Sequence, residues 1–189
     1  MKAFRDSFIL ALPLLLWLPG AGAQAAEYRR VDLAGSHIRF TSRQMGVPVD
    51  GAFRKFDASL AFDPEAPARA RGQLRIDLAS IDTGNREANE EVVGAQWFDV
   101  KRHPHAQFEM RQIQPLGAGR FQVSGVMSIK GSSQPLAFSS AFKASGNQAV
   151  MEGVFVLKRL DFRVGEGIWG DVGVVANEVT VQFHLVLAE

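Results

Sequence analysis

The stretch Ala79–Met110, ASIDTGNREANEEVVGAQWFDVKRHPHAQFEM, is where the hydrophobic period of this 189-residue chain changes. Immediately before it, apolar residues occupy every second position: Leu74, Ile76 and Leu78. Within it, apolar residues are spaced as on one face of a helix: Ala88, Val92 and Val93. Period two is typical of a strand, and the wider spacing is typical of a helix. We therefore predict one short amphipathic helix that interrupts a sheet.

Residues that commonly cap helices stand at both ends of this segment. Asp82 and Thr83 can accept backbone N–H bonds at its start, and Gly94 can adopt the left-handed conformation that ends a helix. Trp97 and Phe98 follow directly. Because neighbouring residues of a strand face opposite sides, we expect the backbone to bend there and bury both rings. A plug over the mouth of a barrel and a helix covering a sheet edge both fit this pattern.

The first 23 residues have the features of a secretory signal peptide. Lys2 and Arg5 precede the apolar run FILALPLLLWLP, and the small residues between Ala21 and Ala25 offer a cleavage site. This run is too short to span a bilayer, and no later stretch approaches the required length. We therefore expect export to the periplasm, with residues 1–23 as the signal peptide and residues 24–189 as one domain.

The predicted mature chain is formally neutral. The 21 basic and 20 acidic side chains of the whole sequence become 19 of each once Lys2, Arg5 and Asp6 are removed. This balance argues against nucleic-acid binding, which needs a summed attraction to phosphates. The chain has no cysteine, so neither disulfides nor thiol redox chemistry can contribute.

Eight strand-like segments, separated by Gly- and Pro-rich turns, cover most of the chain. They are residues 28–43, 49–63, 70–80, 104–114, 119–130, 135–143, 149–164 and 174–188. Each presents one apolar face, and both a closed barrel and a sandwich fit this alternation. Eight strands is the number whose closed barrel is filled by side chains or holds one elongated ligand. Small residues on the apolar face either leave a cavity or make room for larger neighbours: Ala58, Gly125 and Ser140.

Seven short motifs follow one another along the chain. They are Asp32–Phe40 (D-x-x-x-S-x-I-x-F), Gly51-x-Phe53, Ser80–Asn85, Trp97–Val100, His103-Pro104 with Phe108, Gly125–Gly131 and Arg159-x-Asp161-Phe162. In this order and spacing the chain resembles the YceI-like polyisoprenoid-binding family of exported proteins. The resemblance implies an all-β fold, an eight-stranded antiparallel lipocalin-like barrel with one short helix after the third strand. It also implies that a long isoprenoid tail, of a polyprenyl chain or an isoprenoid quinone, binds along the barrel axis.

The chain departs from the usual family pattern at four places. Family members often carry His-Leu at Glu91–Val92, Phe-Phe at Trp97–Phe98, Tyr at His103, and Thr-Ile-Arg-Gly at Ser128–Gly131. A fold survives such changes easily. A head group is held by a few polar side chains, so these departures bear on which ligand is bound.

The predicted lipid-binding residues lie on the apolar parity of their strands. They are Phe40, Phe56, Leu60, Phe108, Met127, Phe138 and Phe183, with Trp97 or Phe98 at the end of the cavity. Arg159 and Asp161 share a face if this segment is a strand. They form either a surface ion pair or, with Arg159 near the barrel mouth, a contact to a polar or anionic head group.

Other chemistry has little support in the sequence. His103 and His105 are the one pair of histidines that lie close in sequence. A metal site needs three or four ligands, so a solvated turn is a better interpretation of this pair than a metal site. No G-x-S-x-G elbow is present. We therefore expect a protein that is not an enzyme, with no metal and no covalent cofactor but with an isoprenoid lipid ligand.

Two functions of different classes follow. The first is a periplasmic carrier or sequestering protein for an isoprenoid lipid, with no nucleic-acid partner and no membrane span. Transient membrane contact and a homodimer are left open. The second is an interaction module of the cell envelope, without a bound lipid, that would show a packed barrel and an exposed apolar patch.

Overall fold

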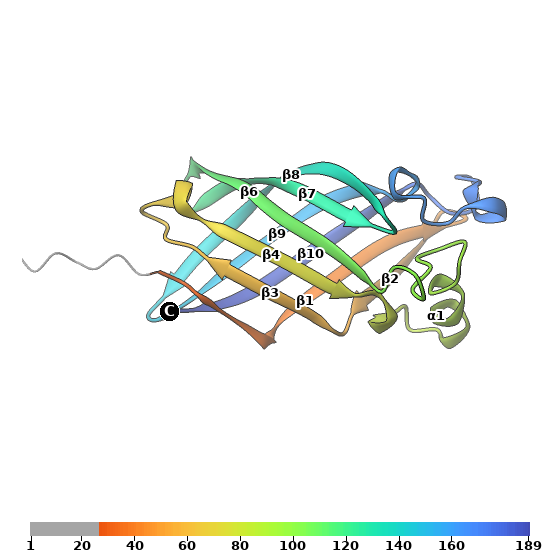
Figure 1. Ribbon diagram of the computed structural model, residues 1–189, viewed down its shortest axis with the longest axis horizontal. Coiled ribbons are helices and arrows are strands. Elements are labelled where there is room, and N and C mark those ends of the chain that lie inside the picture. Colours follow the sequence, from red (N-terminus) through yellow and green to blue (C-terminus); the bar gives the residue numbers. More distant parts are fainter. Residues whose placement is uncertain (1–26) are drawn as a thin grey trace, which may run out of the picture.

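The computed structural model describes residues 27–189, so the predicted signal peptide, residues 1–23, lies outside the described residues. One antiparallel sheet curls into a barrel (Figure 1). Its strands are β1 (Arg30–Gln44), β2 (Val47–Phe53), β3 (Phe56–Ala61), β4 (Arg71–Asp77), β5 (Ile81–Asp82), β6 (His105–Gly117), β7 (Arg120–Ile129), β8 (Ser132–Ser145), β9 (Gln148–Lys158) and β10 (Glu178–Ala188).

The sheet has ten strands instead of the predicted eight, in the order β3-β4-β6-β7-β8-β9-β10-β1-β2-β5. The predicted strand 49–63 is divided at Arg54–Lys55, because β2 pairs with β1 whereas β3 pairs with β4. The tenth strand is the two-residue β5, which extends the edge at β2. An antiparallel bridge between Tyr28 and Phe62, with N···O distances of 2.9 and 3.0 Å, joins the chain before β1 to the chain after β3.

Two-residue hairpins fix the register of adjacent strands. Met45 and Gly46, between β1 and β2, have φ angles of 50° and 81°. Lys130 and Gly131, between β7 and β8, have φ angles of 48° and 73°. Two successive positive φ angles match the turn whose twist suits a hairpin. The predicted antiparallel meander is confirmed for β6 to β10, which pair in chain order.

The single α-helix, α1 (Arg86–Val92), lies at one end of the barrel (Figure 1). Its N-cap is Asn85, whose side chain accepts from the Ala88 N–H at 2.8 Å. The predicted caps Asp82 and Thr83 are wrong, since Asp82 belongs to β5 and Thr83 binds Asn89 instead.

The chain turns sharply after α1. The carbonyl of Gly94 accepts the N–H groups of Trp97 and Asp99. Gly94 itself is not left-handed, which corrects the predicted C-cap, and the positive φ of 52° belongs to Asp99. This turn is the expected bend, and both Trp97 and Phe98 are half-buried in it.

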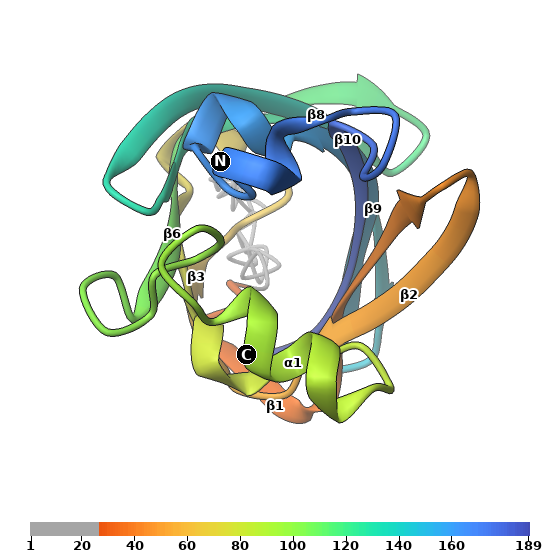
Figure 2. The same cartoon turned by 90° about the vertical axis from the view of Figure 1, so that its right-hand side faces the viewer.

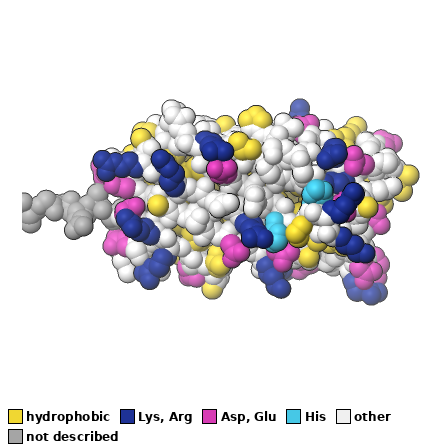
Figure 3. Space-filling model, viewed as in Figure 1, with side chains coloured by type: hydrophobic (Ala, Val, Ile, Leu, Met, Phe, Trp, Pro, Cys, Tyr) yellow, Lys and Arg dark blue, Asp and Glu magenta, His cyan; other side chains and the backbone are white. Residues whose placement is uncertain are grey.

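Four 3-10 helices complete the described elements: η1 (Pro67–Arg69), η2 (Leu78–Ser80), η3 (Arg159–Phe162) and η4 (Gly167–Gly170). The predicted strand 149–164 ends at Lys158 because the chain turns into η3. Arg159 and Asp161 therefore do not alternate as they would in a strand. Among residues 27–189, no helix is long and apolar enough to cross a membrane. The face in Figure 3 mixes basic and acidic side chains, in keeping with the balanced charge.

Candidate ligand cavity

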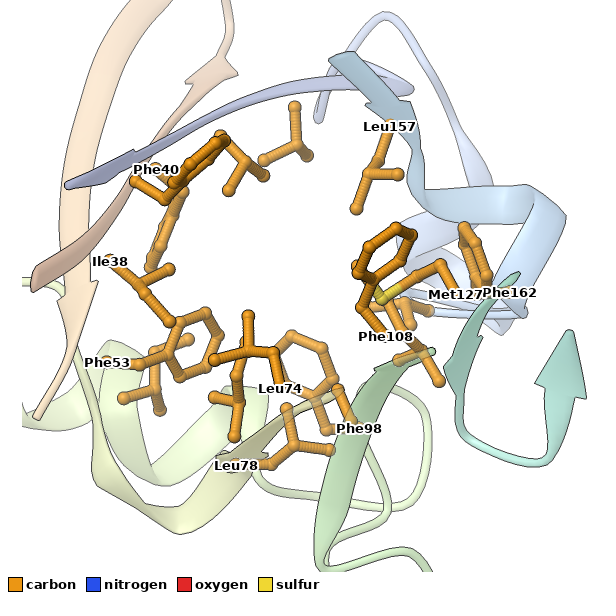
Figure 4. A pocket seen from close by; sticks show the side chains of 18 of the residues that line it. Ile38, Phe40, Phe53, Leu74, Leu78, Phe98, Phe108, Met127, Leu157 and Phe162 are labelled. Carbon is orange, nitrogen blue, oxygen red and sulfur yellow. The ribbon is translucent and has the colours of Figure 1, made fainter. Parts of the chain in front are cut away.

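An apolar cavity of about 540 Å³ runs inside the barrel. Strands around the whole circumference contribute side chains that point into it (Figure 4). Figure 4 labels Ile38, Phe40, Phe53, Leu74, Leu78, Phe98, Phe108, Met127, Leu157 and Phe162. Its volume lies within the range of small-molecule sites in proteins, about 300 to 1,000 Å³. The interior of this barrel is therefore open, in contrast to the packed alternative.

Most of the predicted lipid-binding residues line this cavity. They are Phe40, Leu60, Trp97, Phe98, Phe108, Met127, Phe138 and Phe183. Phe56 does not line it and packs against the core as the first residue of β3. The N–H of Asp77 donates to the carbonyl of Lys55 at 3.0 Å, which brings η2 beside Phe56, and η2 contributes Leu78 to the lining.

The smallest residues of the inner face make room for the largest ones. A Cβ on Gly125 would lie 2.7 Å from the ring of Phe108, and a Cβ on Gly153 would lie 2.7 Å from the ring of Phe183. The space over Gly125 is thus occupied by an aromatic ring. On the same wall Phe138 stacks on Phe155, with ring centroids 4.9 Å apart. The alternation identified Phe108, Phe138 and Phe183, whereas Gly153 and Phe155 were not among the predicted lipid-binding residues.

A cluster of four aromatic rings lies where the barrel is closed by the Tyr28–Phe62 bridge. Edge-to-face pairs join Tyr28 to Phe142 at 5.4 Å, Phe62 to Phe121 at 5.2 Å and Phe62 to Phe142 at 5.1 Å. Phe62 is fully buried, and none of the four rings lines the cavity. We call these four residues the aromatic plug. The N–H of Arg29, next to Tyr28, donates to the carbonyl of Ala188 at 3.0 Å, so the plug lies near the carboxyl terminus, and Figure 1 shows that end opposite α1.

Three segments surround the other end of the cavity, which we call the mouth: the β1–β2 hairpin, α1 and the chain from η4 to Val175 (Figure 2). The indole Nε1 of Trp169 in η4 donates to Oε1 of Glu91 in α1 at 2.9 Å. The rings of Trp97 and Trp169 lie 5.5 Å apart. This latch between α1 and η4 had no signal in the sequence, because the two residues are 78 positions apart.

Arg159 lines the cavity beneath the mouth and is only 5% exposed. Its five N–H groups are all donated to backbone carbonyls: Ala176 at 3.0 Å, Val164 at 2.9 Å, Gly165 at 2.8 Å, Trp169 at 2.7 Å and Val175 at 2.7 Å. Burial lowers the pKa of the Arg159 guanidinium. The group also lies over the ring of Trp97, 5.6 Å from its centroid.

These contacts correct the predicted role of Arg159. No N–H is left to meet a head group, and the side chain is buried, so it is not a surface partner of Asp161 either. Arg159 instead binds together the chain between Val164 and Ala176 that forms one side of the mouth.

Few charged side chains line the cavity. Apart from Arg159, the charged residues of the lining are Glu87 and Glu91, both on α1. Within the described residues, Nε1 of Trp97 is a buried donor without an acceptor. This N–H has almost no accessible surface, so it is closed to the cavity.

His103 and His105 lie apart from each other in their contacts, whereas the rings of His37 and His184 are stacked with centroids 5.0 Å apart. The ring of His105 lies against the Arg75 guanidinium at 3.1 Å, whereas the ring of His103 lies over Gly131. Among residues 27–189, no three His, Cys, Asp or Glu side chains are placed to hold a metal ion.

Comparison with known proteins places this architecture in context. The sequence profile described as YceI-like domain matches residues 30–187. A UPF0312 protein of Azotobacter vinelandii is 32% identical over 181 residues, which cover 90% of this chain and 92% of that protein. A UPF0312 protein of Ectopseudomonas mendocina is 28% identical over 165 residues, which cover 82% and 86% of the two chains.

Solved structures share the fold. BcnA of Burkholderia cenocepacia is 41% identical, with a TM-score of 0.81 over 83% of this chain and 99% of that chain. A polyisoprenoid binding domain from Saccharophagus degradans is 19% identical, with a TM-score of 0.67 over 87% of this chain and 99% of that chain. At this identity the second similarity concerns the fold alone.

Proposed function

Because this chain belongs to the YceI-like domain family, we propose that it binds an isoprenoid lipid in the periplasm and carries or sequesters it without changing it chemically. The observation that carries the proposal is the open apolar cavity, closed at one end by the aromatic plug. Burial of hydrocarbon contributes about 0.8 kcal/mol per CH₂ group. A few isoprene units therefore suffice to offset an association cost of about 4 to 15 kcal/mol.

The head group that the mouth favours is uncharged. A phosphate would meet the carboxylates of Glu87 and Glu91 and would find no free N–H on Arg159. A quinone carbonyl carries no charge and therefore meets no such repulsion. We therefore favour an isoprenoid quinone over a polyprenyl phosphate.

Native mass spectrometry of protein purified from its own host, followed by organic extraction, tests the proposal. We expect one bound lipid per chain, with the mass of an isoprenoid quinone or another uncharged polyprenyl compound. Recovery of no lipid, or of fatty acids alone, would contradict the proposed ligand class.

A further inference from the structure

Four large apolar side chains are strongly exposed around the mouth. Ile168 is 77% exposed, Met45 76%, Val47 63% and Val172 55%. Met45 and Val47 belong to the β1–β2 hairpin, whereas Ile168 and Val172 belong to η4 and the chain after it. We call these four residues the apolar rim. Apolar side chains in water do not contribute to the stability of a fold. Several of them around one opening indicate a surface that contacts an apolar partner.

The two halves of the apolar rim are held together by backbone hydrogen bonds. The N–H of Met45 donates to the carbonyl of Val174 at 2.8 Å, and Gln44 forms an isolated bridge with Val175. Arg159 fixes the same chain from inside through the carbonyls of Trp169 and Val175. The rim is therefore a preformed surface with its apolar groups directed outward.

The apolar rim is directly continuous with the cavity lining. Gln44 precedes Met45, and Trp169 follows Ile168, and both Gln44 and Trp169 line the cavity. A molecule bound against the rim thus lies beside the mouth. Charges of both signs flank it, with Arg43 and Asp171 both exposed, so the rim does not select an anionic partner by charge.

We propose that the apolar rim inserts into the surface of a phospholipid bilayer, so that the lipid passes between bilayer and cavity without crossing water. The inference rests on the proposed function for its purpose, since an isoprenoid tail resides in bilayers. The rim side chains come from two segments beside the opening of the cavity, so a bilayer that receives them also lies against that opening. Interfacial segments bind membranes through apolar groups of this kind.

The decisive comparison uses two matched pairs of substitutions. Met45→Asn with Ile168→Thr removes two side chains of the rim, and Asn accepts the φ of 50° at position 45. Val154→Thr with Val156→Thr removes two side chains that are 56% and 51% exposed on β9, in the barrel wall. The amino terminus of each purified protein is read by mass spectrometry, because a retained apolar run FILALPLLLWLP would itself bind lipid.

Sedimentation with phosphatidylcholine vesicles measures docking, and quenching of the combined emission of Trp97 and Trp169 by brominated phosphatidylcholine reports contact at the mouth. We expect the rim pair to bind vesicles at least about tenfold more weakly, with loss of quenching, and the wall pair to bind like the unaltered protein. All three proteins should bind an isoprenoid quinone equally when it is supplied in detergent.

Three outcomes would overturn the proposed docking surface. They are no vesicle binding by the unaltered protein, equal losses in the two pairs, and sedimentation of the unaltered protein as a dimer that the rim substitutions dissociate. Normal quinone binding in detergent alongside any of these would leave the proposed function standing. Failure of the unaltered protein to bind an isoprenoid quinone in detergent would instead contradict the proposed function.

Discussion

At the scale of single residues, the mouth depends on one buried cation. Arg159 donates hydrogen bonds to five backbone carbonyls of a segment that belongs to no strand of the sheet. Buried carbonyls without a donor are costly, so the loop from Val164 to Ala176 needs this planar fork of donors. The sequence identified Arg159 as important but could not reveal this role, because its partners are backbone atoms.

Arg159→Lys should destabilise the fold even though it keeps the charge. Lysine has three donors on a single nitrogen and leaves at least two carbonyls unpaired, so we expect a loss of at least about 2 kcal/mol in the free energy of unfolding. Urea unfolding measures this loss. Arg54→Lys, at an exposed ion pair with Asp82, is the control and should change stability by less than about 1 kcal/mol. Equal stability of the two variants would contradict the role given to Arg159.

His37 should make stability depend on pH. Burial, followed by the charges of Arg39 and His184, lowers its pKa below the ordinary 6.5. The unfolded chain therefore takes up a proton on His37 before the folded chain does, and the contribution of this residue is lost as pH falls below about 6.5. We expect His37→Gln to flatten the fall in urea midpoint between about pH 7.5 and 5.5. An unchanged slope would count against this assignment.

At the scale of elements, alternation predicted strands well where one face is buried along the whole segment. It failed at Arg54–Lys55, because a strand that changes partners keeps its alternation. It failed again at Arg159, where the apolar residues change from the parity of Phe155 and Leu157 to that of Leu160 and Phe162 as the backbone turns into η3. The helix was found from its period, but its cap is Asn85 because β5 extends to Asp82.

The latch between α1 and η4 should slow lipid release. Glu91→Ala removes the acceptor of the Trp169 N–H, and one such hydrogen bond is worth about 0.5 to 1.5 kcal/mol, or about two- to tenfold in rate. We expect release of a bound isoprenoid quinone to accelerate by that factor in stopped-flow transfer to excess vesicles. Glu91→Gln retains an acceptor oxygen and should release at nearly the normal rate. Identical rates for Ala and Gln at this position would show that the latch does not limit release.

At the scale of the whole molecule, the design is a barrel with one sealed and one open end. The inner lining was predictable because each lining residue, such as Phe40, Phe108 or Phe183, lies on the apolar side of the alternation in its own strand. The mouth could not be predicted in this way. Its residues Trp169, Glu91 and Gln44 come from η4, α1 and the end of β1, which share no hydrophobic period. Whether the interior was open or packed also could not be predicted, since Gly125 serves mainly to admit the ring of Phe108.

The central claim is that the barrel interior is a ligand site, and Met127→Trp tests it most directly. Met127 lines the cavity, so a larger ring there takes up ligand space. Phe121→Trp is the matched control, because it enlarges a side chain in the aromatic plug, away from the cavity lining. Overpacking of a dense core costs about 1 to 3 kcal/mol, whereas an open cavity absorbs the ring.

The measurement is native mass spectrometry of delipidated protein titrated with an isoprenoid quinone, alongside urea unfolding without lipid. We predict that the unaltered protein binds one quinone per chain and that Met127→Trp binds none while it unfolds within about 1 kcal/mol of the unaltered protein. Phe121→Trp should lose stability but keep the quinone. Normal quinone binding by Met127→Trp, or a loss of stability as large as that of Phe121→Trp, would contradict an open ligand cavity at this position.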